Sequence, residues 1–204
     1  VGNRIGIQGI GAIMKAMVED GLTFPEVDAI FGPALGRPKT AIFKTVDLVG
    51  LDTVMHVCKN SYELCPDDEQ RDALILPDYV EKMAEKNLFG NKTQAGFYKT
   101  ELTPEWKKLR KVLNPSTMEY EDLVRPSFPC IDEAKKKSTL KEKVDCVLNG
   151  DDKGGKFAWK MASNSFQYAA NRVPEIADTI IEIDNSMKWG YNFEMGPFEA
   201  WDAY

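Results

Sequence analysis

A helical unit occurs twice in this 204-residue chain, which limits the folds open to it. In each half a long helical pattern is followed by a shorter one with an aspartate, then by a loop and a Phe-x-x-x-Asp pair. One loop residue absorbs the difference in length between the copies. The paired positions are Pro25 and Pro174, Asp28 and Asp184, Phe43 and Phe198, and Asp47 and Asp202. Because such a unit cannot bury its apolar face alone, the repeat predicts two units packed against each other.

Apolar residues recur at helical spacing through most of the chain. The segment from Thr23 to Glu26 is a capping box with proline in its first turn, and Gly50 is suited to end a helix. No segment shows a convincing strand alternation, so the sequence predicts an all-α fold. Residues 114–130 contain three prolines and are expected to form a linker. Helices are expected at residues 4–19, 24–31, 41–49, 52–64, 77–90, 103–113, 131–149 and 157–171, with another starting at Pro174.

The composition is that of an ordinary globular protein, with 43% hydrophobic residues, 28% charged residues and a net charge of -6. Acidic residues interleave with the lysines at 135–143, which indicates a solvated helix face rather than a nucleic-acid site. No membrane span or signal peptide is evident, so we expect a cytoplasmic protein that binds neither nucleic acid nor membrane. The chain starts at Val1 and ends at Tyr204 inside helical patterns, which suggests a piece of a longer protein.

Common cofactor and metal motifs are absent from the sequence. The glycines at 6–11 lie in a helical pattern with no preceding strand, so they lack the context of a Rossmann nucleotide site and are expected to allow close helix packing. The only histidine, His56, lies in an apolar helical run and is expected to pack or face solvent. The cysteines match no zinc or redox motif, and reduced thiols are expected, although a disulfide is left open. They are Cys58, Cys65, Cys130 and Cys146.

An ordered series of motifs carries a resemblance to a known family. Asn3-Arg4 opens a long helix, and it is followed by the Gly/Pro loop at 32–38, by Phe43, Asp47 and Gly50, and by Lys92-Thr93-x-x-Gly96-Phe97-Tyr98. Over residues 1–99 this order resembles the C-terminal domain of the 3-hydroxyacyl-CoA dehydrogenases. Residues 155–204 resemble a second, degenerate and truncated copy, and residues 100–154 form a linker with helices. The second copy has the family's Gly-Pro-Phe-Glu at 196–199, whereas the first has Ala-Ile-Phe-Lys at 41–44.

The resemblance implies two tandem copies of a helical domain of the 6-phosphogluconate-dehydrogenase-C-terminal type, packed as a pseudo-dimer. It implies an NAD-dependent (3S)-3-hydroxyacyl-CoA dehydrogenase of fatty-acid β-oxidation, in which this piece supplies part of the substrate cleft and the oligomerisation surface. NAD and a catalytic His–Glu pair would belong to a missing N-terminal Rossmann domain, so the isolated piece is expected to be inactive. The implied partners are an acyl-CoA substrate, that Rossmann domain, an enoyl-CoA hydratase domain in the parent protein, and a second copy in a homodimer or the internal pseudo-dimer.

The resemblance also implies roles for individual residues. The amide of Asn3 would donate a hydrogen bond to the substrate oxygen on C3, whereas the residues alone also allow an N-cap at this position. Pro38 and Thr45 would form part of the acyl-chain wall. Arg4 is expected to be a structural ion-pair or interface residue, and Asp47 a structural carboxylate near helix N-termini or backbone amides. The alternative function is a non-catalytic dimerisation module of a related hydroxy-acid or 3-hydroxybutyryl-CoA dehydrogenase.

Overall fold

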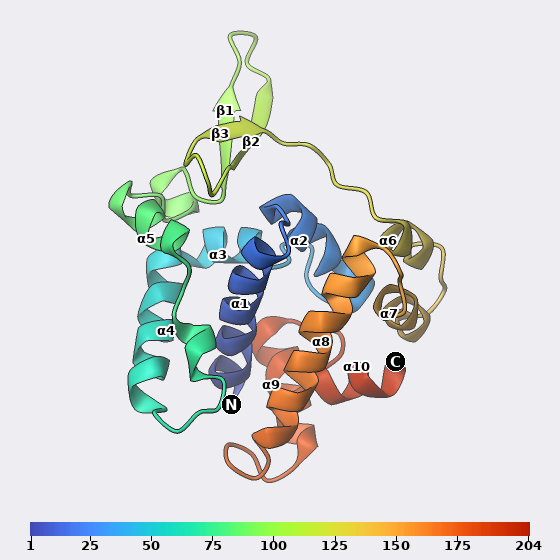
Figure 1. The fold of residues 1–204 in the computed structure, drawn as a ribbon. Coiled ribbons are helices and arrows are strands. Elements are labelled where there is room, and N and C mark those ends of the chain that lie inside the picture. Colours follow the sequence, from blue (N-terminus) through green and yellow to red (C-terminus); the bar gives the residue numbers. More distant parts are fainter.

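The computed structural model describes residues 1–204 and is mostly helical (Figure 1). None of its helices is long and apolar enough to cross a membrane. The α-helices are α1 (Gly2–Glu19), α2 (Phe24–Ile30), α3 (Phe43–Val49), α4 (Leu51–Leu64), α5 (Asp78–Glu85), α6 (Pro129–Ala134), α7 (Leu140–Leu148), α8 (Lys153–Asn171), α9 (Ile180–Tyr191) and α10 (Pro197–Ala203). Short 3₁₀ turns are η1 (Pro33–Leu35), η2 (Arg71–Leu74) and η3 (Asn91–Thr93), and the strands are β1 (Tyr98–Leu102), β2 (Lys108–Leu113) and β3 (Tyr120–Asp122).

The two long helices α1 and α8 lie side by side in the centre of the molecule, with α9 also packed on α1 (Figure 1). Helices α3, α4 and α5 cover one side, and α6, α7 and α10 lie on the other. One continuous apolar core includes Met14 and Met17 of α1, Phe24 of α2 and Phe157 of α8. The first and last parts of the chain therefore share a core rather than forming separate bodies.

The all-α prediction is wrong at residues 98–122, which form a three-stranded antiparallel sheet that projects from the helical body (Figure 1). The predicted helix at 103–113 is instead a turn followed by β2, and Tyr98 pairs with Val112 across the hairpin. Thr103 and Lys107 close the turn by a backbone hydrogen bond of 2.9 Å. A threonine-proline-glutamate sequence is a common helix start. Here, however, the backbone N–H and C=O groups of β2, which a helix would pair internally, are paired across the strands instead.

The second short helix begins later than the sequence analysis predicted. Pro174 lies in a turn, and α9 starts at Ile180 behind a capping box formed by Thr179 and Glu182. This box matches the predicted box of Thr23 and Glu26, which is confirmed at α2. Proline alone marks a helix start poorly, because it is equally suited to turns, whereas a reciprocal cap satisfies two free amides.

Asp28 and Asp184 occupy the same position in the two units. Asp28 accepts hydrogen bonds from the backbone N–H groups of Ile42 and Phe43 at 3.0 and 2.8 Å. Asp184 accepts them from Phe198 and Glu199 at 2.9 and 3.2 Å. Ile42 and Phe198 are each the first of the two donors to the aspartate of their unit, so Ile42, not Phe43, corresponds to Phe198. The one-residue difference in loop length that the sequence analysis predicted is therefore wrong.

The predicted pairing of Asp47 with Asp202 fails for the same reason. Asp202 is exposed, and the neighbouring Ala203 is buried in its place. Asp47 itself is buried and accepts hydrogen bonds of 2.9 Å from the backbone N–H groups of Phe97 and Tyr98. The structural role predicted for Asp47 is confirmed, because its carboxylate holds the backbone of residues 97 and 98 against α3.

Candidate functional site

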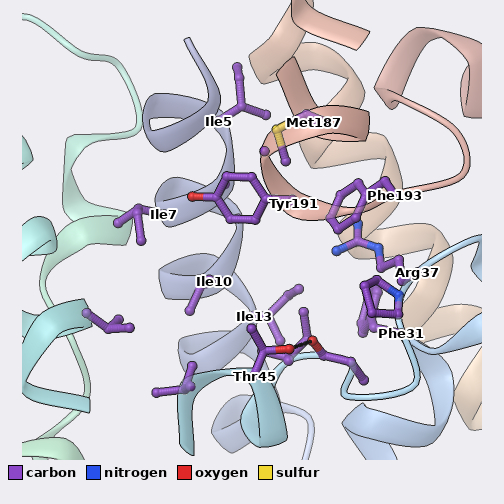
Figure 2. Close-up of a pocket in the computed structure, with 18 of the residues that line it drawn as sticks. Ile5, Ile7, Ile10, Ile13, Phe31, Arg37, Thr45, Met187, Tyr191 and Phe193 are labelled. Atoms are coloured by element: carbon purple, nitrogen blue, oxygen red, sulfur yellow. Dashed lines mark hydrogen bonds between the residues drawn. The ribbon is translucent and has the colours of Figure 1, made fainter. Parts of the chain in front are cut away.

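A cavity of about 560 Å³ lies between the two halves of the chain (Figure 2). Its volume is typical of small-molecule sites, which range from about 300 to 1,000 Å³. One wall is the row of isoleucines on α1, and Met187, Tyr191 and Phe193 face it from α9 and the following loop. Residues of the 31–42 loop, α3, α4 and α8 complete the lining.

The structure brings the three predicted site residues, Asn3, Pro38 and Thr45, to this one cavity. Thr45 donates its hydroxyl to the carbonyl oxygen of Ala41 at 2.8 Å, so its hydroxyl hydrogen is taken up by the loop that precedes α3. Pro38 has no polar side-chain atom. Both residues can therefore form an apolar wall, as the resemblance implies, but neither is placed to donate a hydrogen bond to a ligand.

Asn3 is not a helix cap. Helix α1 starts at Gly2 behind Val1 and has no side-chain cap, so Asn3 is the second residue of the helix. The hydroxyl of Tyr191 donates a long hydrogen bond of 3.4 Å to Oδ1 of Asn3. A donor on Oδ1 fixes the orientation of the amide and leaves its two N–H donors free for a ligand.

Two of the glycines of α1 admit neighbouring groups, as predicted. A Cβ on Gly6 would collide with the ring of Tyr191, and one on Gly11 would collide with the carbonyl oxygen of Ala73. Gly9 has no atom near its Cβ position and lines the cavity. The glycine at position 6 therefore seats Tyr191 beside Asn3.

Arg37 is the only charged residue among those that line the cavity. Its guanidinium lies between two aromatic rings, with Cζ 5.1 Å from the ring centre of Phe31 and 4.5 Å from that of Phe193. Sequence reasoning missed Arg37, Tyr191 and Phe193. For Arg37 the visible signal was a single arginine between a glycine and a proline in an irregular loop. Tyr191 and Phe193 lie in the second half of the chain, where nothing in the sequence indicates that they meet this loop.

The lining provides hydrogen-bond donors, among them the hydroxyls of Ser165 and Tyr191, but no carboxylate, imidazole, thiol or amine that could act as a base near neutral pH. It contains no Asp, Glu, His, Cys or Lys. His56 is exposed, and its Nε2 lies 3.0 Å from the amide nitrogen of Asn60, as expected for a surface histidine. All four cysteines are free thiols. The site can bind and orient a ligand, but it cannot by itself remove a proton from one.

A buried ion-pair cluster outside the cavity lining confirms the structural role predicted for Arg4. Nε of Arg4 donates to Oδ2 of Asp68 at 2.8 Å and to the hydroxyl of Tyr168 at 2.9 Å. Tyr168 in turn donates to Asp68 at 2.6 Å, and Arg172 pairs with the same carboxylate at 3.4 Å. The cluster joins α1 and the loop after α4 to the end of α8.

The helical body and its apolar cavity have the size and lining that are typical of a small-molecule binding site. Residues 1–100 match the family of the 3-hydroxyacyl-CoA dehydrogenase, C-terminal domain, and this part of the chain belongs to that family. The resemblance noted from the motifs is thus confirmed.

Curated relatives extend the similarity along the chain. A probable 3-hydroxyacyl-CoA dehydrogenase of Bacillus subtilis is 39% identical over 203 residues, which is 100% of this chain and 25% of that protein. A putative fatty acid oxidation complex trifunctional enzyme of Rickettsia felis is 30% identical over 98% of the chain and 26% of its own length. A probable 3-hydroxyacyl-CoA dehydrogenase of Deinococcus radiodurans is 43% identical over 99 residues, 48% of the chain and 28% of that protein.

The chain spans about a quarter of the length of these relatives. No solved structure matches it. The names of the relatives connect the chain with oxidoreductases of fatty acid oxidation.

Proposed function

We propose that this chain is the C-terminal part of an NAD-dependent (3S)-3-hydroxyacyl-CoA dehydrogenase of fatty-acid β-oxidation, a cytoplasmic enzyme in which it forms part of the substrate cleft. The observation that carries the proposal is the gathering of Asn3, Pro38 and Thr45 around one apolar cavity in a chain of this family. These are the residues to which the family resemblance gives the oxygen donor and the acyl-chain wall.

Asn3 acts in this proposal as a hydrogen-bond donor to the substrate oxygen on C3. Its Oδ1 is engaged by Tyr191, so Nδ2 is the atom that a ligand in the cavity meets. Such a donor stabilises negative charge that develops on the oxygen, and the apolar walls around it exclude water and strengthen the interaction.

In this proposal the nicotinamide cofactor is held outside this chain. Its only sheet is antiparallel and has three strands, so it cannot form the parallel sheet and glycine-rich turn of a dinucleotide site. NAD and the acid–base residues belong in the proposal to a preceding Rossmann domain, and the isolated chain is inactive. The name of the trifunctional relative supports a multifunctional parent, and an enoyl-CoA hydratase domain in that parent is part of the proposal.

The chain also forms, in this proposal, two tandem helical units packed as a pseudo-dimer. Residues 1–99 are the first unit, 155–204 are the second, and 100–154 join them. The matched carboxylates of Asp28 and Asp184, each binding the first amides of the next helix, support the repetition. Exposed tryptophans at 189 and 201 on the second unit are suited to the oligomerisation surface.

The rate of NAD reduction by the full parent protein tests the function. We expect Asn3→Ala to lower kcat about 10²–10³-fold, the usual effect of removing one hydrogen-bond donor to an oxyanion. The melting temperature of the protein should not change. Substrates would range from 3-hydroxybutyryl-CoA to 3-hydroxydecanoyl-CoA. Asn60→Ala removes an exposed amide outside the cavity and serves as the matched control.

The outcomes of this experiment separate the proposed function from its alternatives. An unchanged kcat in Asn3→Ala would leave the chain as scaffold and dimerisation module. Activity confined to 3-hydroxybutyryl-CoA would favour the related short-chain dehydrogenase. No activity of the unmodified protein with any of these thioesters would refute the proposal.

Tyr191→Phe tests whether Tyr191 positions the amide of Asn3. Loss of one neutral hydrogen bond, about 0.5–1.5 kcal/mol, predicts a kcat about 2–10-fold lower. The same substitution made together with Asn3→Ala should cause no further loss, because the amide that it orients is gone. A loss of equal size in both backgrounds would mean that Tyr191 contributes by packing alone.

A further inference from the structure

Arg37 is a cation without a counter-ion in the cavity. Its guanidinium makes no ion pair or side-chain hydrogen bond within the chain, whereas Arg4 and Arg172 both pair with Asp68. Phe31 and Phe193 lie near the centre of the group at 5.1 and 4.5 Å. Aromatic contacts of this kind stabilise the cation but accept none of its five N–H donors in the manner of a carboxylate.

Arg37 is half-buried, and its guanidinium has no acceptor within the chain, so its N–H groups remain available to a group that enters the cavity. Burial lowers the pKa of Arg37 to about 10, so the group still carries its charge at neutral pH. The residue is held in place between rings of the first and second halves. An arginine held in this way is prepared to bind a planar carboxylate or a phosphate through two parallel hydrogen bonds.

The rest of the lining narrows the class of ligand. It holds no acidic residue that would repel an anion, and 16 of its 28 residues are hydrophobic, chiefly isoleucine, valine and aromatic residues. Figure 2 shows the guanidinium of Arg37 beside Phe193, with the isoleucines of α1 across the cavity. An occupant that satisfies both features has an apolar chain and one anionic group.

We propose that the cavity binds an amphipathic anion, and that Arg37 holds its carboxylate or phosphate while the isoleucine wall covers its apolar chain. If the proposed function is correct, two parts of an acyl-CoA could supply this anion. One is a carboxylate at the far end of a dicarboxylic acyl chain, and the other is a phosphate of the CoA moiety. The identity of the ligand as an acyl-CoA rests on the proposed function, but the preference for an anion does not.

Calorimetric binding to the full parent protein tests the preference without any need for turnover. The probes are decanoate, decyl phosphate and 1-decanol, which share one apolar chain. We expect at least one of the two anions to bind about 10–100-fold more tightly than 1-decanol, and Arg37→Gln to abolish this difference. Arg37→Lys should retain part of it, because a lysine keeps the charge but loses the bidentate geometry.

Lys39→Gln removes the same charge from an exposed position on the same loop and is the matched control. It should leave the anion preference intact. The proposal is overturned if 1-decanol binds as tightly as both anions, or if Arg37→Gln weakens all three probes by the same factor. The second result would assign Arg37 a packing role only.

Turnover then distinguishes the two sources of the anion. The substrates are 3-hydroxydecanoyl-CoA, 3-hydroxydecanedioyl-CoA and 3-hydroxydecanoyl-pantetheine, which lacks the phosphates. In Arg37→Gln, a fall in kcat/KM confined to the dicarboxylic substrate supports the chain-end carboxylate. A fall for both CoA substrates but not for the pantetheine thioester supports the phosphate, and an equal fall for all three contradicts the proposal. Absence of turnover in the unmodified protein refutes the proposed function, while the binding experiment still decides the role of Arg37.

Discussion

Replacing Asp68 with asparagine is expected to lower the free energy of unfolding by about 3 kcal/mol. The side chain of Asp68 is almost fully buried and accepts hydrogen bonds from Arg4, Tyr168 and the backbone N–H of Gln70. The introduced amide would keep the shape but lose the charge, which leaves Arg4 and Arg172 with only the half-exposed Glu175 and Glu69 as partners. The measurement is urea unfolding followed by circular dichroism.

Asp132→Asn is the matched control for this prediction. Asp132 pairs with Lys135 at 2.7 Å on the surface of the molecule, and an exposed pair contributes about 0.2–1 kcal/mol. A loss of this small size for Asp68→Asn as well would contradict a structural role for the buried cluster.

The cluster should also make the fold sensitive to acid. Burial alone would raise the pKa of Asp68, but the bonds from Tyr168, Gln70 and Arg4 outweigh it and hold the pKa below its usual value. Because folding lowers this pKa, the stabilisation is complete above about pH 4, the pKa of an unfolded aspartate, and is lost as the pH falls through the lower, folded pKa. Between pH 7 and pH 3 the free energy of unfolding should therefore fall less in Asp68→Asn than in the unmodified protein.

Several helices with local signals were predicted correctly from the sequence, but the helix expected at 131–149 is two helices, α6 and α7, and a capping box of Thr139 and Glu142 marks the start of the second. The capping box at Thr23 and the apolar periodicity of α1 and α8 are signals within the helices themselves, so they can be read from a short stretch of sequence. A further box at Thr179 was equally visible, and it marks the true start of α9 better than Pro174 does. The three-stranded sheet was missed because its stability comes from cross-strand pairing, which no single strand reveals.

Some residues of the candidate site could likewise be identified from the sequence, and others could not. Asn3, Pro38 and Thr45 were identified through the family resemblance of residues 1–99, and they do line one cavity. Tyr191 and Arg37 depend on packing between the halves, because Tyr191 reaches Asn3 from α9 and Arg37 lies against Phe193. Helical periodicity is a property of one segment and cannot report which segments meet.

Asp47→Ala is expected to lower the free energy of unfolding by about 2–5 kcal/mol. The substitution removes the only acceptor for two backbone N–H groups, those of Phe97 and Tyr98, and each buried group left unpaired costs about 1–3 kcal/mol. No side-chain movement can replace the carboxylate easily, because Gly90 and Gly96 pack so closely on Asp47 that a Cβ on either would collide with it.

Asp202→Ala is the control for this prediction, since the sequence repeat paired Asp202 with Asp47. Asp202 is exposed on α10, and its replacement should change the stability by no more than about 0.5 kcal/mol. Equal losses for the two variants would mean that the carboxylate of Asp47 is not the group that holds the 97–98 backbone.

The loss caused by Asp47→Ala should depend on pH in a direction opposite to that of Asp68. Burial raises the pKa of Asp47 to about 6, even though the two backbone hydrogen bonds lower it. Between about pH 4 and 6 the folded protein therefore binds a proton that the unfolded chain releases, so the contribution of this group to stability falls as the pH rises through that window. Urea unfolding at pH 5 and pH 7.5 should give a loss about 1 kcal/mol larger at the lower pH. A loss that grows with pH instead would mean that Asp47 is ionised throughout and that its hydrogen bonds outweigh its burial.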